Sequence, residues 1–137
     1  MADYLYDFGL DEWRDWETDT IKVLGLKSTY VPSRAHHYVD DVVAYELTAS
    51  GYARHTVTGK TRGVDTTNHR ISYDCDDISL GSPAAGNTIG WVAFYKQVTT
   101  DSDSILLALF AYPTTATSGS PITATIPADG VHYLDQA

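Results

Sequence analysis

Two histidines and two aspartates stand close together, at His36, His37, Asp40 and Asp41. On a helical turn His36 and Asp40 would share one face, as would His37 and Asp41, and imidazole with carboxylate is a donor set that zinc accepts. A structural metal needs three or four ligands, each oriented by a hydrogen-bond partner of its own. The sequence identifies no further ligand, so we interpret the segment as a polar loop near a subunit interface and predict no metal.

Two other acidic clusters could bind cations. Residues 74–77 read Asp-Cys-Asp-Asp, and residues 101–103 read Asp-Ser-Asp. Neither has the alternating oxygen ligands, central glycine and terminal glutamate of a calcium-binding EF-hand loop. We interpret the first as the charged end of a strand, in which Cys75 points inward, and the second as a turn.

The sequence favours a protein without catalytic activity. Cys75 is flanked by carboxylates, which oppose formation of the thiolate that a nucleophile requires. The sequence contains no nucleophile elbow, P-loop, dinucleotide-binding glycine motif or zinc-protease motif. Glutamates that could form a glycosidase pair are scarce: only Glu12, Glu17 and Glu46 occur. We therefore predict neither an enzyme nor a cofactor.

Composition narrows the class of partner. The 137 residues suffice for one domain, and a hydrophobic content of 43% predicts a packed core. The net charge of −9 opposes binding to nucleic acids and to anionic membranes. A single cysteine excludes an internal disulfide, and we find neither a secretory signal nor an apolar membrane span. These features predict a soluble protein made in a reducing cytoplasm.

The stretch that organises the chain is residues 88–112. Two apolar runs, at residues 91–95 and 105–112, flank a polar break at residues 99–104. Such runs are typical of strands buried on both faces, and the break favours a turn. We therefore expect a β-hairpin at the centre of the core, with its second strand ended by Pro113.

The rest of the chain predicts an antiparallel sandwich of about eight short strands, jelly-roll or immunoglobulin-like, within one domain at residues 17–137. Apolar alternation and turn residues delimit the other strands. These expected strands are residues 21–26, 43–47, 54–58, 61–65, 70–74, 122–126 and 131–134.

Residues 1–16 predict a short helical arm. Leu5 and Phe8 stand three apart, as do Trp13 and Trp16, which suits a helical stripe that Gly9 interrupts. Tryptophans are costly to leave in water, so these two either cap the core or dock on a neighbouring subunit. Ten tyrosines also favour oligomerisation or docking, because tyrosine is enriched at interfaces. The residues that we predict at such an interface are Tyr4, Phe8, Trp13, Trp16, Tyr30 and Tyr38.

Six segments in collinear order resemble a group of small tailed-bacteriophage virion proteins. They are D-T-D-T-I-K-V, matched at residues 17–23; T-H-x-Y/F-x-D-V, matched loosely at 35–42; E-x-x-x-x-G-Y, at 46–52; L-T-G-K-T-V-x-x-D-x-T-N-x-R-x-x-F-D-A-D-D, at 57–77; A-V-x-Y-K-D, at 92–97; and P-A-D-G-I, at 127–131. The chain departs from the pattern in its tryptophan-rich start, in Cys75, where alanine is usual, and in Gln97, where an acid is common.

The resemblance implies a virion structural protein without catalytic residues. We expect a capsid decoration (minor capsid) protein, bound as a homotrimer to the major capsid protein on the outside of the head. The same resemblance leaves open a tail, baseplate or head-fibre base component. A carbohydrate-binding adhesion module, which would use tyrosine or tryptophan faces, is a third hypothesis from another class.

Overall fold

The computed structural model describes residues 2–135, which form ten strands and three short 3₁₀ helices. In chain order these elements are β1 (Tyr4–Leu5), η1 (Phe8–Asp15), β2 (Ile21–Lys27), η2 (Val39–Asp41), η3 (Val43–Tyr45), β3 (His55–Thr56), β4 (Thr61–Asp65), β5 (Arg70–Asp74), β6 (Ile78–Ser79), β7 (Thr88–Lys96), β8 (Ile105–Ala116), β9 (Thr123–Ala124) and β10 (His132–Asp135). None of the described helices is long and apolar enough to cross a membrane.

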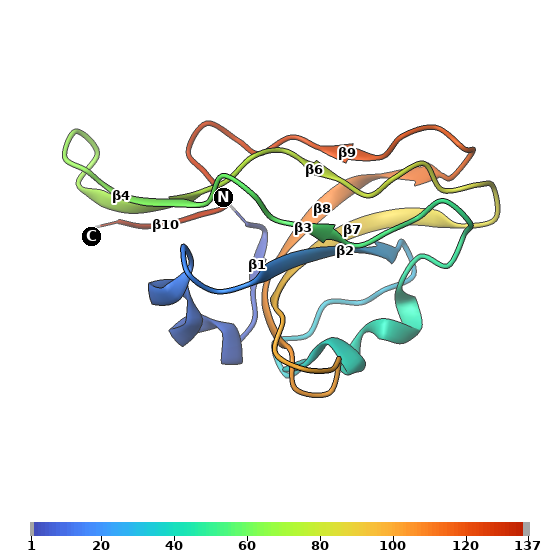
Figure 1. Ribbon diagram of the computed structural model, residues 1–137, viewed down its shortest axis with the longest axis horizontal. Coiled ribbons are helices and arrows are strands. Elements are labelled where there is room, and N and C mark those ends of the chain that lie inside the picture. The colour runs from blue at the N-terminus through green and yellow to red at the C-terminus, as the bar shows by residue number, and fades with distance from the viewer. Residues whose placement is uncertain (1, 136–137) are drawn as a thin grey trace.

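The strands form an all-β, sandwich-like fold, as predicted. The main sheet has the order β1-β8-β7-β2-β3, and the strands pair in antiparallel fashion. Two smaller antiparallel sheets, β10-β5-β4 and β6-β9, form the second layer above it in Figure 1. The hairpin of β7 and β8 lies at the centre of the main sheet, which confirms the expected core hairpin.

The main sheet is buried on both faces, which explains its long apolar runs. On β7, Val92 and Phe94 face the second layer, whereas Ala93 and Tyr95 face the opposite side. That opposite side is covered by the segment with η2 and η3, where Val39 and Val42 are fully buried. The connection between β2 and β3 therefore forms a third layer below the sheet (Figure 1).

Residues 2–16 are an integral part of the sandwich, in contrast to the arm that the sequence predicts. Strand β1 lies along β8, with Tyr4 opposite Leu109. Helix η1 then packs so closely on β8 that a Cβ atom on Gly9 would collide with the backbone of Leu106 and Leu107. Glycine is required here for the close approach of two backbones, and it does not interrupt the helix.

Two expected elements differ in the structure. Residues 43–47 do not form a strand; Val43–Tyr45 is a 3₁₀ helix, because Val39 and Val42, three residues apart, both turn into the core. Pro113 does not end β8, which continues to Ala116. Proline is tolerated there because it occupies an edge strand at an irregularity in the pairing with β7.

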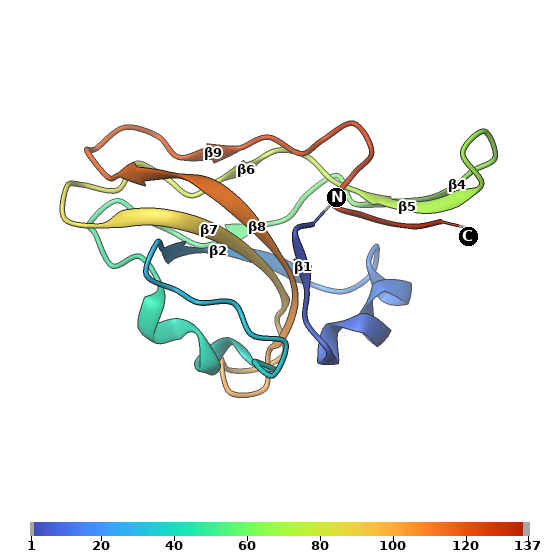
Figure 2. The ribbon, with the colours of Figure 1, turned by 180° about the vertical axis from the view of Figure 1, so that it is seen from behind.

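The sheet of β4, β5 and β10 extends beyond the body of the sandwich. Its β4–β5 hairpin turns at residues 66–69, as predicted, and its tip projects away from the main sheet (Figures 1 and 2). Helix η1 supports the base of this sheet, where Trp13 contacts the rings of Tyr73 and His132. Farther out on the sheet, Val64 and Leu134 are exposed among the described residues.

Candidate functional site

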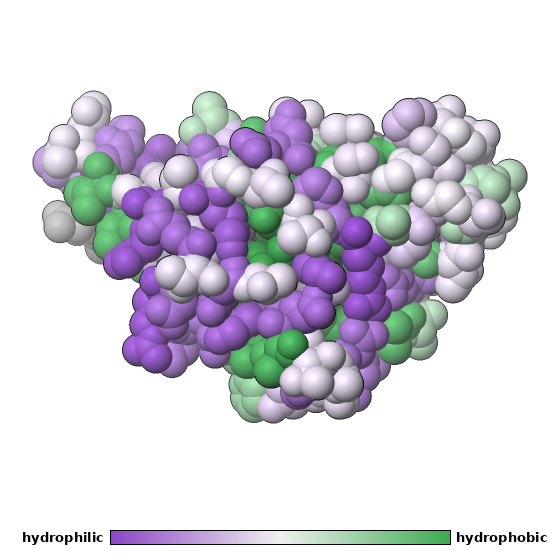
Figure 3. All heavy atoms as spheres, in the orientation of Figure 1, coloured by the Kyte–Doolittle hydropathy of each residue, from purple (hydrophilic) through white to green (hydrophobic). Residues whose placement is uncertain are grey.

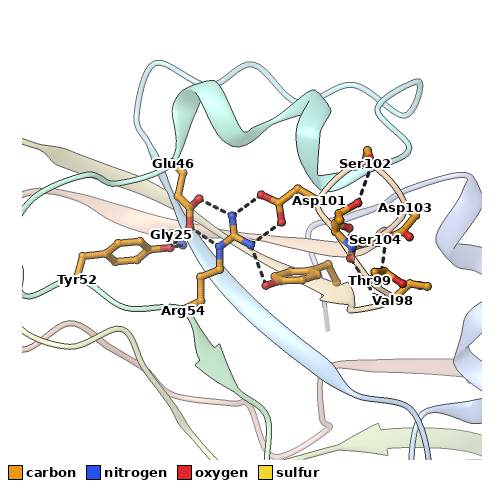
Figure 4. A network of polar contacts seen from close by, with 12 residues as sticks. Gly25, Glu46, Tyr52, Arg54, Val98, Thr99, Asp101, Ser102, Asp103 and Ser104 are labelled. Atoms are coloured by element: carbon orange, nitrogen blue, oxygen red, sulfur yellow. Dashed lines mark hydrogen bonds and ion pairs between the residues drawn. The ribbon is translucent and has the colours of Figure 1, made fainter.

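The most connected polar cluster surrounds Arg54 (Figure 4). Its guanidinium forms paired hydrogen bonds with the carboxylates of Glu46 and Asp101 and one with the Tyr95 hydroxyl, at 2.7–3.2 Å. Tyr52 donates to Glu46 at 2.6 Å. These bonds raise the pKa of Arg54 and lower that of Asp101. All five donors of Arg54 are used, so the cluster links the loops that carry Glu46 and Asp101 to the main sheet.

The histidine and aspartate residues near His36 serve the local fold. Asp41 accepts hydrogen bonds from the backbone N–H groups of His37 and Tyr38, at 2.8 and 3.0 Å, which lower its pKa. His36 Nδ1 is 2.8 Å from the Tyr30 hydroxyl. These two side chains therefore have separate partners, and residues 2–135 contain no group of three or more potential metal ligands.

The acidic cluster at residues 74–77 is spread over several loops. Asp74 accepts from the N–H of Cys75, Asp76 from the Thr58 hydroxyl, and Asp77 from the N–H of Ile126. Asp103 likewise closes the β7–β8 turn by accepting from Thr99 and Thr100. Each carboxylate stabilises a different turn or connection.

Cys75 is a buried free thiol. Burial, reinforced by the carboxylates of Asp74, Asp76 and Asp77, raises its pKa to about 12. At neutral pH the thiol is therefore protonated and weakly nucleophilic. This agrees with the sequence analysis, which predicted an inward-pointing cysteine in an acidic setting.

Half of the residues that we predicted at an interface lie in the core. Trp16 is 0% exposed and donates from Nε1 to the carbonyl of Asp74, and Trp13 stacks against it. Tyr30 is 3% exposed and shares a hydrogen bond with the Tyr6 hydroxyl. Trp13 and Trp16 thus cap the core, which was one of the two alternatives, and these three side chains offer no surface to a partner.

The other predicted interface residues remain accessible in part. Phe8 is exposed and stacks on His37 with ring centroids 3.6 Å apart. Tyr38 packs edge-on against Phe8, and Arg34 lies over the ring of Tyr4. Phe8 and Tyr38 therefore form a small aromatic group beside η1, with Tyr4 on the neighbouring edge strand.

An apolar surface that the sequence analysis missed lies on the projecting sheet. Val64, Ile71 and Leu134 are direct cross-strand neighbours on β4, β5 and β10, so their side chains share one face. Val64 is 74% and Leu134 53% exposed, and Leu10 of η1 is also exposed. We call Val64, Ile71, Leu134 and Leu10 the tip patch.

The tip patch is continuous and hollowed. One recess of about 450 Å³ is lined by Val64, Ile71 and Leu134, and a second, of about 250 Å³, by Leu10 and Leu134. The projecting sheet lies at the left of Figure 3, where apolar residues (green) lie among hydrophilic ones (purple). The hairpin register could have revealed one part of the patch, because Val64 and Ile71 lie symmetrically about the predicted turn, whereas Leu134 joins them only through the long-range pairing of β10 with β5.

Comparison of the chain with protein-family models, with curated proteins and with solved structures finds no match in any of the three.

Proposed function

We propose that this protein is a structural component of a bacteriophage virion that decorates the outside of the capsid and acts through protein–protein contacts, without catalysis. The observation that carries the proposal is the tip patch. Large aliphatic side chains exposed side by side on a projecting sheet are typical of surfaces that a partner covers. The ordered resemblance of residues 17–134 to virion proteins suggests the class of partner, a major capsid protein.

The polar clusters support a structural role. The groups around Arg54 and in residues 74–77 use their hydrogen-bonding capacity to join loops. A decoration protein needs a rigid block and an attachment surface, and the buried sheet and the tip patch supply these two features. Its acidic exterior would also keep virions dispersed.

Binding of purified protein to undecorated capsid shells tests the proposal. Val64→Asp places a carboxylate in the tip patch, and we expect about a tenfold or larger loss in co-sedimentation with the shells. Val31→Asp is the matched control, because Val31 is 75% exposed but lies outside the patch. Equal binding by the two variants would contradict the role of the tip patch.

Copy number distinguishes the head from the tail. Quantitative mass spectrometry of purified virions should find on the order of hundreds of copies per particle if the protein repeats across the shell. A dozen copies or fewer, by contrast, would identify a tail, baseplate or fibre-base component and overturn the decoration role.

A further inference from the structure

Three side chains from two distant segments form a continuous series of hydrogen bonds. The hydroxyl of Tyr6 is 2.9 Å from that of Tyr30, and the Tyr30 hydroxyl is 2.8 Å from Nδ1 of His36. Tyr6 follows β1, whereas Tyr30 and His36 lie in the connection from β2 to η2, in the third layer of Figure 1. Tyr6 is 0% and Tyr30 3% exposed, and His36 is half-buried. The series therefore leads from the core to the surface.

One direction of this series satisfies every donor while His36 is neutral. Among residues 2–135, the Tyr6 hydroxyl has no hydrogen-bond partner other than Tyr30. Burial raises the pKa of both tyrosines, so both hydroxyls keep their protons. Because a hydroxyl donates a single proton, Tyr6 must donate to Tyr30, and Tyr30 to Nδ1 of His36. Nδ1 is then bare, which places the proton of the neutral imidazole on Nε2.

A second proton on His36 disrupts the series. Both ring nitrogens of an imidazolium are donors, so Nδ1 can no longer accept from Tyr30. If the ring stayed in place, Nδ1–H would donate to Tyr30 and Tyr30 to Tyr6, and the Tyr6 O–H would lack an acceptor in the core. A buried donor without an acceptor carries the full cost of its desolvation. If the ring departs, Tyr6 still donates to Tyr30, and Tyr30 can donate to water.

The segment that carries His36, residues 31–36, depends on Tyr30 for its attachment. Its backbone-to-backbone hydrogen bond, from the N–H of His36 to the carbonyl of Ser33, stays within the segment. In the described part of the chain, the hydrogen bonds that leave the segment go to the Tyr30 hydroxyl, from Nδ1 of His36 and from the backbone of Ser33. We call residues 31–36 the Tyr30 loop.

We propose that protonation of His36 releases the Tyr30 loop and opens the Tyr30 hydroxyl to water, so that the loop acts as a pH-sensitive switch. Imidazole is the side chain that changes its charge between about pH 5 and 8. The loop should therefore be attached at the upper end of this range, where His36 accepts from Tyr30, and released at the lower end.

The charges around the loop are compatible with this release. The titratable groups that face it from neighbouring elements and from the same connection are Asp41 of η2, Tyr45 of η3, Tyr4 of β1, Arg34 and His37. Asp41 stays ionised throughout the range, because the backbone N–H groups of Tyr38 and His37 lower its pKa. Its carboxylate attracts an imidazolium at His36, whereas the Arg34 guanidinium lies over the ring of Tyr4. The protonated ring thus gains a favourable neighbour when it leaves Tyr30.

Nuclear magnetic resonance of the full chain tests the switch. At about pH 7.5, nitrogen shifts should show a bare Nδ1 and a protonated Nε2 on His36, and a nuclear Overhauser effect should connect its ring to that of Tyr30, at 5.6 Å between centroids. At about pH 5 this effect should be lost while the resonances of β7 keep their folded shifts. Tyr30→Phe should give a mixture of tautomers and a ring contact that does not change with pH. Tyr45→Phe is the matched control, because it removes a hydroxyl from a ring packed on Tyr30 and leaves the series intact.

Three results would overturn the inference. Neutral His36 could carry its proton on Nδ1, the ring contact of the wild type could persist at about pH 5, or Tyr30→Phe could respond to pH as the wild type does. The first two results need only the wild-type chain, so they decide the question even if Tyr30→Phe does not fold. The switch does not require capsid binding, so failure of the co-sedimentation assay would leave it standing.

Discussion

Arg54 shows what a single residue contributes to this fold. Its side chain is only 26% exposed and joins Glu46, before β3, to Asp101 in the β7–β8 turn. Removal of the guanidinium would leave the Glu46 carboxylate, which is 11% exposed, without a positively charged partner and with only the hydrogen bond from Tyr52. An uncompensated charge of this kind is costly, because the remaining group stays out of water.

We therefore expect Arg54→Ala to lower the free energy of unfolding by on the order of 3 kcal/mol, measured by urea denaturation. Arg14→Ala is the control, because Arg14 pairs with Asp11 and Asp15 on the exposed surface and should change stability by less than about 1 kcal/mol. If the two variants were equally stable, the Arg54 cluster would not be a structural clamp.

His132 gives the protein a predictable response to acid. It is buried between Trp13 and Tyr73, its Nδ1 has no hydrogen-bond partner, and burial lowers its pKa below the usual 6.5. The unfolded chain therefore takes up a proton at a higher pH than the folded chain. Stability should fall as the pH drops below about 6.5 and level off once the pH is below the folded pKa.

The measurement is urea unfolding at pH values between about 7.5 and 5. His132→Phe keeps an aromatic ring in the stack and should remove the part of the pH dependence that lies in this range. His69→Asn, at an exposed turn position with positive φ that asparagine also adopts, should retain that part. An unaltered pH dependence in His132→Phe would contradict this account.

At the scale of the elements, β8 exposes a long edge that is protected from strand pairing. Strand β1 pairs only with Leu109 and Ala108. Beyond it, Asp3 binds the N–H of Ala111, Pro113 lacks one, and the Thr115 hydroxyl donates to the carbonyl of Pro113. Such features prevent edge-to-edge aggregation in natural sheets.

A double variant, Asp3→Ala with Pro113→Thr, should therefore aggregate. It restores two free donors on a strand of high β-propensity, and we expect light scattering of a warmed solution to rise several-fold above that of the wild type. Asp7→Ala with Pro113 intact is the control, because Asp7 is an exposed acid outside the edge. Equal scattering by the two proteins would show that the edge is protected by something else.

The sequence predicted strands and turns correctly where the pattern of apolar and polar residues along the chain matches their burial in the folded core. The apolar runs of β7 and β8 and the turns after Asp65 and Val98 follow from residue types alone. The helix at Val43–Tyr45 was missed because a short apolar run does not distinguish a strand from a 3₁₀ turn. The tip patch depends on the pairing of β10 with β5, which joins residues about 60 positions apart, and no local pattern encodes such a pairing.

At the scale of the whole molecule, the N-terminal segment completes the core of the sandwich and is required for its stability. Trp13 and Trp16 fill one end of the core, and β1 covers β8. Loss of two buried indole rings costs several kcal/mol each, which is comparable to the total stability of a small domain.

Deletion of residues 1–16 should therefore unfold the protein. Circular dichroism and thermal unfolding should show no cooperative transition. A milder change, Phe8→Ala, removes an aromatic ring that is exposed and should leave the melting temperature within a few degrees of the wild type. If the truncated chain still melts cooperatively, this prediction is wrong and residues 1–16 form a separable arm.

The burial of Cys75 has a practical consequence for following this protein in assembly. Because the native thiol is inaccessible and protonated, maleimide reagents at neutral pH should leave it unlabelled. A cysteine introduced at an exposed threonine, Thr66 or Thr125, would then be the single reactive position. Fluorophores attached there would report by energy transfer which ends of neighbouring molecules approach one another, without prior removal of the natural cysteine.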